Sequence, residues 1–198
     1  MTPFQYPSKP HVRRHGPRGY RDRESFRPWL RDEFAFRCVY CLRREQWDRA
    51  TSLHVEHFFP SSQFPDQELA YDNLLYACNR CNAAKSDQIT ADPCQFLLAD
   101  AVMVQADGSL LAAERRSRQL IAQLRLNNAE MVHYRRLWLE IIAMAKQANA
   151  SLYGQLLGFP SDLPNLRTLR PPGGNNRPEG IEQSYWSQRQ RGVLPESY

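Results

Sequence analysis

The sequence has no long hydrophobic run. In its 198 residues no apolar stretch approaches the roughly 20 residues that a membrane-spanning helix needs, so we expect no membrane segment. The N-terminus is polar, with prolines and arginines where a secretory signal would have an apolar run. We therefore expect a cytoplasmic protein whose thiols stay reduced. No internal repeat is present, and the length suits one domain with appendages.

A strong overall charge is also lacking, since the formal net charge is only +5. Its distribution is uneven: residues 1–31 carry eight Lys or Arg against two acidic residues, which gives +6 there and −1 in the remainder. Such a basic arm predicts a segment that contacts phosphates, with Arg13, Arg14 and Arg18 as its candidate contacts. The alternative is a solvated, partly disordered leader.

The five cysteines are grouped in a way that indicates metal binding. Cys38-x-x-Cys41 and Cys78-x-x-Cys81 can each turn two sulfurs toward one tetrahedral centre, which predicts a structural Zn²⁺ site. The 36 residues between the pairs exceed the spacing of a simple zinc ribbon, so a folded segment is expected between them. Disulfides are the alternative, which the lack of a signal disfavours. Cys94 lies outside both pairs and is expected to be a buried core residue.

The segment between the cysteine pairs holds candidate catalytic residues. Ser52–Phe59 is rich in β-branched and aromatic residues and precedes Pro60, which predicts a strand. A loop over 61–71 and a strand or turn should then lead to the second pair, and Asn79–Asp87 suits a short helix.

Outside this segment the pattern is helical and then irregular. Glu24–Phe36 predicts a short helix that leads into the first cysteine pair. The Asp107-Gly108 turn within 102–111 predicts a hairpin. Helices are expected over 112–126 and 129–151. From Gly158 onward we expect a largely irregular tail, held to the body or to a partner by Tyr185 and Trp186.

The motifs CVYC, LHVEHFFP, YDNLLYACNRCN and AAKSD together resemble the HNH endonucleases, the His-Me finger nucleases with a ββα-metal core. The resemblance covers about residues 36–90. It implies that His57 is the general base, that Glu56 and Asn82 hold a catalytic metal, and that Asn73 braces the loop carrying His57. Glutamate at position 56 departs from the aspartate that is commonest in the family.

The residue chemistry agrees with this assignment. A histidine with a pKa near 6.5 is largely neutral in the cell and can accept a proton from water. Mg²⁺ or Mn²⁺ prefers oxygen ligands, which Glu56 and the Asn82 amide can offer. His54 is a further candidate metal ligand or phosphate contact. Lys85 is a candidate phosphate contact on the helix.

A second resemblance extends further along the chain. The hairpin followed by helix-LRLNN-helix is similar to the C-terminal part of HNH proteins that work beside an ATPase in bacterial antiphage systems, Septu and retron types among them. It implies an ATPase or sensor protein as a partner.

The sequence thus predicts an α+β protein with a treble-clef ββα-metal (HNH) core and a helical C-terminal extension. The predicted divisions are 1–31 (basic arm), 32–100 (nuclease core), 101–157 (hairpin and helices) and 158–198 (tail). The expected activity is metal-dependent hydrolysis of DNA in bacterial defence, with RNA as another candidate substrate. Two alternatives stay open: an effector subunit held inactive by an ATPase or sensor, and a non-catalytic zinc module that binds nucleic acid.

Overall fold

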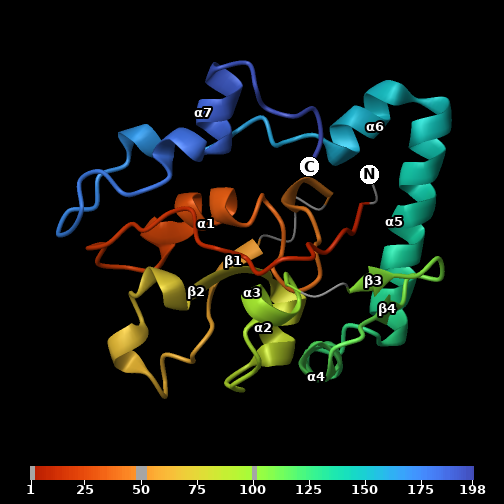
Figure 1. Cartoon of the computed structure of the whole chain (residues 1–198), viewed down its shortest axis with the longest axis horizontal. Helices are drawn as coiled ribbons and strands as arrows, with labels where there is room; N and C mark the ends of the chain where they lie inside the picture. The colour runs from red at the N-terminus through yellow and green to blue at the C-terminus, as the bar shows by residue number, and fades with distance from the viewer. Residues whose placement is uncertain (1–2, 48–52, 100–101) are drawn as a thin grey trace.

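The computed structural model describes residues 3–47, 53–99 and 102–198. At its centre, β1 (Leu53–His57) and β2 (Leu74–Cys78) pair in antiparallel register, with Leu53 opposite Cys78 and His57 opposite Leu74. Helix α2 (Asn79–Lys85) begins directly after β2 (Figure 1). This arrangement confirms the predicted α+β class with a ββα core.

The central sheet is buried because helix α1 (Arg27–Glu33) packs against both of its strands. Every residue of β2 is buried, and in β1 only His54 is partly exposed. Pro28 lies in the first turn of α1, where its missing N–H has no helical partner to lose. After the helix, Ala35 and Phe36 adopt left-handed conformations (φ 50° and 57°) that turn the chain into the first cysteine pair.

The C-terminal region is largely helical, as predicted. Its hairpin consists of β3 (Met103–Val104) and β4 (Leu110–Leu111). The helices are α3 (Pro93–Phe96), which was not predicted, α4 (Arg115–Gln123), α5 (Ala129–Ala148) and α6 (Ala150–Leu157). The predicted helix over 129–151 is divided because the Asn149 side chain accepts a hydrogen bond from the Leu152 N–H and starts α6. No helix in the described ranges is both long and apolar enough to cross a membrane.

The tail runs back over the N-terminal half of the molecule (Figure 1). It contains one short helix that was not predicted, α7 (Tyr185–Gln190). Tyr185 packs against Phe36 with ring centroids 5.7 Å apart, so the predicted attachment of the tail through Tyr185 is confirmed. The 3-10 helices are η1 (Glu24–Phe26), η2 (Glu45–Trp47), η3 (Pro65–Gln67), η4 (Tyr71–Asn73), η5 (Leu166–Thr168) and η6 (Ile181–Gln183).

The N-terminal segment packs on the core, which corrects the alternative of a solvated, partly disordered leader. Phe4 and Tyr6 are buried in the main core. Arg13 donates to the Leu74 carbonyl at 2.6 Å, and its guanidinium lies over the Phe34 ring. These contacts replace the solvent exposure that the composition indicated.

Two adjacent carboxylates at the end of α1 hold this segment in place. The buried Glu33 accepts hydrogen bonds from the His11 side chain, the Arg14 and His15 N–H groups and the Tyr71 hydroxyl. Burial alone would raise its pKa, but these hydrogen bonds and the neighbouring histidines outweigh burial and lower the pKa of Glu33 to about 2.

The neighbouring carboxylate, Asp32, ties the N-terminal segment to the tail. It accepts hydrogen bonds from the His15 ring at 2.9 Å, from Arg14 at 3.0 Å and from the Tyr185 N–H at 2.8 Å. The other ring nitrogen of His15 lies 3.3 Å from the Glu179 carbonyl. The two ends of the chain therefore meet on a buried ionic network.

Candidate functional site

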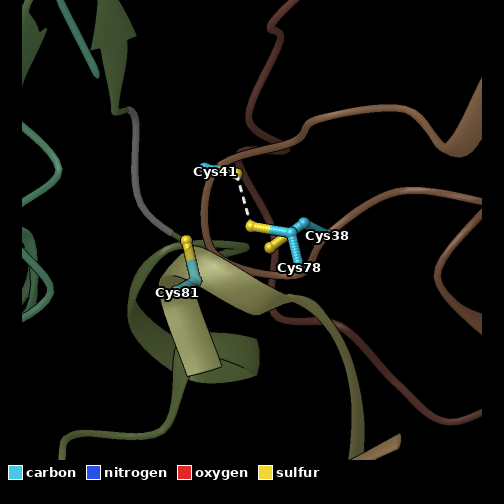
Figure 2. Close-up of side chains that lie close together, drawn as sticks. All are labelled: Cys38, Cys41, Cys78 and Cys81. Atoms are coloured by element: carbon cyan, nitrogen blue, oxygen red, sulfur yellow. Dashed lines mark hydrogen bonds between the residues drawn. The ribbon is translucent and has the colours of Figure 1, made fainter. Parts of the chain in front are cut away.

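Four cysteine sulfurs converge beside the central sheet (Figure 2). Their Sγ atoms all lie within 4.8 Å of one another, and those of Cys41 and Cys78 are 3.7 Å apart. A tetrahedral ion with metal–sulfur bonds of about 2.3 Å would place its sulfurs about 3.8 Å apart. The cysteines, all buried and none in a disulfide, therefore fit a tetrahedral metal centre: Cys38, Cys41, Cys78 and Cys81.

Local backbone structure aims these sulfurs at one point. The first pair lies in a tight turn in which the Leu42 N–H donates to the Cys38 carbonyl and Leu42 is left-handed (φ 58°). Cys78 ends β2, and Cys81 lies in the first turn of α2. Cys94 lies outside this group, and burial raises the pKa of its thiol to about 12, which agrees with the predicted core role.

A polar cavity of about 300 Å³ opens in front of β1. Four residues that the sequence singled out line it together: His54, Glu56 and His57 from β1, and Asn82 from α2. The wall is completed by Arg23, Glu24, Val55, Pro60, Ser61, Ser62, Asn79, Ser86 and Asp87.

His57 is held by the backbone on one side and faces the cavity on the other. Its Nε2 lies 3.0 Å from the Glu68 carbonyl oxygen, which can only accept, so this nitrogen carries the hydrogen. In a neutral imidazole the lone pair is then on Nδ1. Burial lowers the pKa of His57, with the positive charges of Arg23 and Lys85 adding to the effect and the Glu68 carbonyl opposing it. The ring is therefore neutral at neutral pH.

Glu56, the predicted acidic metal ligand, is a buried carboxylate with two internal partners. One oxygen lies 2.8 Å from the Lys85 ammonium, and the other accepts from the Tyr40 hydroxyl at 2.9 Å. Burial raises the pKa of Glu56, while Lys85 and Tyr40 oppose that rise. A carboxylate has about four acceptor positions, so two remain for another donor or a cation.

Lys85 does not contact solvent, which corrects its prediction as a phosphate-binding residue. Its side chain is 1% exposed, and Nζ donates to the His57 carbonyl at 2.8 Å in addition to pairing with Glu56. The physical reason is that a buried carboxylate needs a nearby positive charge. Lys85 thus fixes the backbone of β1 at the candidate catalytic positions.

Asn73 braces the loop that follows β1. Its side-chain oxygen accepts from the Phe59 N–H at 2.7 Å, and its amide donates to the carbonyls of Phe59 and Gln67, each at 3.1 Å. Asn73 is not among the residues that line the cavity. Asn73 therefore ties the start of the loop after β1 to Gln67, the residue that precedes Glu68.

Asn82 presents an available amide to the cavity. Within the described ranges its side chain has no hydrogen-bond partner, although its backbone carbonyl accepts from the Ser86 N–H. His54 is the partly exposed residue of β1 and lines the same cavity. The amide oxygen of Asn82 is a metal-ligand type that suits hard cations.

The arginines predicted to contact nucleic acid differ in their burial and in their contacts. Arg13 and Arg14 are engaged by the core, because Arg13 lies over Phe34 and Arg14 pairs with Asp32. These internal partners engage both guanidinium groups, and the role of the two arginines as phosphate contacts stays a prediction. Arg18 has an exposed side chain and stays a candidate.

Sequence reasoning missed Tyr40, which links the two parts of the site. It lies between Cys38 and Cys41, and its hydroxyl reaches Glu56 in β1. No local pattern shows this contact, since it joins residues 16 positions apart. Asp87, by contrast, lines the cavity and belongs to the AAKSD segment, which offered a signal.

Residues 38–88 match the HNH endonuclease family, so the segment that contains the four cysteines and most of the cavity is an HNH endonuclease domain. The Septu protein PtuB of Bacillus thuringiensis is 39% identical to this chain over 49 residues. That match covers 25% of this chain and 19% of the relative, so the chain resembles the relative over less than a fifth of the relative's length.

Proposed function

We propose that this protein is a metal-dependent endonuclease that hydrolyses phosphodiester bonds, with DNA as its main substrate and RNA as a candidate. One observation carries the proposal: within an HNH endonuclease domain, a single open cavity gathers His54, Glu56, His57 and Asn82. A base, a carboxylate and an amide oxygen around one space are the groups that phosphodiester hydrolysis requires.

In this proposal His57 is the general base. Its Nε2–H is occupied by the Glu68 carbonyl, so the Nδ1 lone pair takes the proton from the attacking water. Burial keeps the ring neutral and ready to accept. Asn73 and Lys85 act as positioning residues, one bracing the loop after His57 and the other holding the His57 carbonyl.

The catalytic metal would be held by Asn82 and Glu56, with His54 as a third candidate. The free amide of Asn82 and the two unused acceptor positions of Glu56 suit an ion such as Mg²⁺ or Mn²⁺. When bound, such an ion polarises the phosphoryl oxygen and stabilises the leaving oxygen. Lys85 offsets the charge of Glu56 while the carboxylate is buried.

The four cysteines would hold a structural Zn²⁺. A closed four-sulfur shell is typical of structural zinc, because it leaves no position for substrate. Tyr40 would link this centre to the cavity, because it lies between Cys38 and Cys41 and its hydroxyl donates a hydrogen bond to Glu56.

One such centre would cut one strand at a time, so a single chain should nick duplex DNA. The similarity to a Septu protein supports a role in bacterial antiphage defence, in which an ATPase or sensor would control the nuclease. The chain would then be an effector subunit as well as an enzyme.

A second candidate is a zinc module that binds nucleic acid without cutting it. The pairing of Glu56 with Lys85 favours it, because a neutralised carboxylate attracts a metal less strongly. The free Asn82 amide and the neutral His57 favour the enzyme.

Plasmid nicking tests the proposal. With Mg²⁺ or Mn²⁺, His57→Ala should lower the cutting rate by about 10²-fold or more, the scale of general-base catalysis. The matched control is His133→Ala, which changes an exposed histidine of α5 and should cut like the wild type. Zinc content and thermal unfolding should be the same in all three proteins. Equal cutting by wild type and His57→Ala would refute the assigned base.

A further inference from the structure

The tail forms a second concave site outside the HNH endonuclease domain. Its volume is about 650 Å³. The lining comes from η5, η6 and the loop between them, and it includes three arginines: Arg167, Arg170 and Arg177, with Pro178, Gly180, Ile181, Glu182 and Gln183.

This site carries an excess of positive charge. Arg167 pairs with Glu182 at 2.5 Å, and Arg170 donates to the Arg167 and Leu169 carbonyls. Among the described residues Arg177 has no hydrogen-bond or ionic partner, and its side chain is exposed. Among the described residues only Arg167 of these three arginines has an acidic partner, so the positive charges of Arg170 and Arg177 are not neutralised at the hollow. Planar guanidinium groups bind phosphate oxygens with two parallel hydrogen bonds.

The buried network of Asp32 and His15 holds the backbone on both sides of the hollow's 180–183 segment. The Glu179 carbonyl is held by His15, and the Tyr185 N–H is held by Asp32. Both contacts are at the edges of the segment that carries Gly180 to Gln183. The hollow is therefore built on ordered backbone.

A second set of contacts joins the hollow to the N-terminal segment. The Gly173 N–H donates to the Gly19 carbonyl at 3.1 Å, and Asn175 bonds both the Arg18 N–H and the Gly16 carbonyl, each at 2.8 Å. Gly19 approaches so closely that an added Cβ would overlap the backbone of Gly174.

The same N-terminal segment leads to the catalytic cavity. Arg23 lines that cavity and lies four residues from Gly19, so the two positions are at most about 14 Å apart along an extended chain. Arg18, whose N–H donates to Asn175 of the tail, has an exposed side chain next to Gly19 in the sequence. Figure 1 shows the tail loop and this segment on one edge of the molecule.

We infer that this hollow, lined by Arg167, Arg170 and Arg177, binds backbone phosphates of the nucleic acid whose scissile bond lies in the catalytic cavity. This inference rests on the proposed nuclease function. A polyanionic strand fits better than a small anion, because exposed arginines lie both at the hollow (Arg177) and on the N-terminal segment that leads to the cavity (Arg18 and Arg23). The contacts are to phosphates, so they add affinity without sequence preference.

Salt-dependent binding tests the inference. The probe is a fluorescent DNA duplex without added divalent cation, and the protein carries His57→Ala so that cleavage cannot interfere. Arg177→Ala breaks no internal contact, so its fold should be unchanged. The slope of log affinity against log salt should fall in magnitude by about 0.9 for one lost phosphate contact, and affinity should drop at every salt concentration.

Arg115→Ala is the matched control. Arg115 is an exposed arginine of α4 with no partner in the part of the chain described, and its loss removes the same charge far from the hollow in sequence. An unchanged slope for Arg177→Ala, or an equal decrease for both variants, would overturn the inference. Binding that depends on Arg177, together with a wild type that does not nick plasmid DNA with Mg²⁺ or Mn²⁺, would support the hollow while refuting the proposed nuclease function.

Discussion

Single side chains in this protein owe their properties to what surrounds them more than to their residue type. Glu56 and Lys85 are both charged residues that composition would place in water, yet each is nearly fully buried against the other. The roles proposed for His57 and Asn73 could be predicted because ordered motifs identify them. The burial of Lys85 could not, because it depends on a carboxylate 29 positions away in the sequence, in another element.

The carboxylate of Glu33 supplies a prediction about pH. Its pKa is about 2 in the folded protein and 4.5 when unperturbed, so its stabilising effect is complete above pH 4.5 and is lost as pH falls toward 2. The shift corresponds to about 3 kcal/mol. Glu33→Gln should therefore be less stable than the wild type at neutral pH, and the difference should narrow as the pH falls below 4.5.

Urea unfolding followed by tryptophan fluorescence, from neutral pH to about pH 3, measures this difference. If the four cysteines hold a metal, its loss in acid would affect both proteins alike and would cancel in the comparison. A difference that stays constant over the whole range would contradict the assigned role of Glu33.

At the scale of elements, the sequence predicted those helices and strands that are determined by residues within or next to the element. The hairpin β3–β4 and the helices α2, α4 and α5 follow from turn residues and apolar periodicity near each element. The short helix α7 did not, since its six residues are held by the buried Ser184 and Ser187 and by packing of Tyr185 on Phe36. Such helices form through tertiary contacts, which a local pattern does not contain.

The β3–β4 turn supplies a prediction about an element. Gly108 is left-handed (φ 88°), and an added Cβ would overlap the Val132 carbonyl and lie 2.7 Å from the Arg136 nitrogen, both on α5. Gly108→Ala should lower the free energy of unfolding by about 2 kcal/mol. Gly154→Ala is the matched control, because a methyl group added there would meet no neighbouring atom within 4 Å and alanine favours helix α6.

Chemical denaturation measures the free energy of unfolding of both alanine variants. We expect Gly154→Ala to be as stable as the wild type or more stable by less than about 1 kcal/mol. Equal stability of Gly108→Ala and Gly154→Ala would show that the hairpin does not dock on α5 as described.

For the whole molecule, a metal held by the four cysteines would be a cross-link around the β1–β2 pair. The 36 residues between Cys41 and Cys78 include β1 and most of β2, so an ion at this centre closes a loop that contains His57. Closing a loop of about that length removes roughly 4 kcal/mol of entropy from the unfolded chain. The centre itself was predictable from spacing alone.

Cys78→Ser should therefore bind less than one metal ion per chain and unfold at a markedly lower temperature, as should the wild type after treatment with a strong chelator. Cys94→Ser is the control, because this buried thiol lies outside the centre and its loss should leave the metal content unchanged. Thermal unfolding and metal analysis of the three proteins measure the effect. Identical metal content in Cys78→Ser and the wild type would remove Cys78 from the centre.

The junction of Asp32 with Tyr185 has a consequence for how the chain is made. The two residues are 153 positions apart, and ribosomal synthesis proceeds from the N-terminus, so Asp32 and His15 emerge long before the tail that completes their network. Until the tail is synthesised, Asp32 of the nascent protein lacks its hydrogen bond from the Tyr185 N–H. The protein's final compaction must wait until Tyr185 has been synthesised.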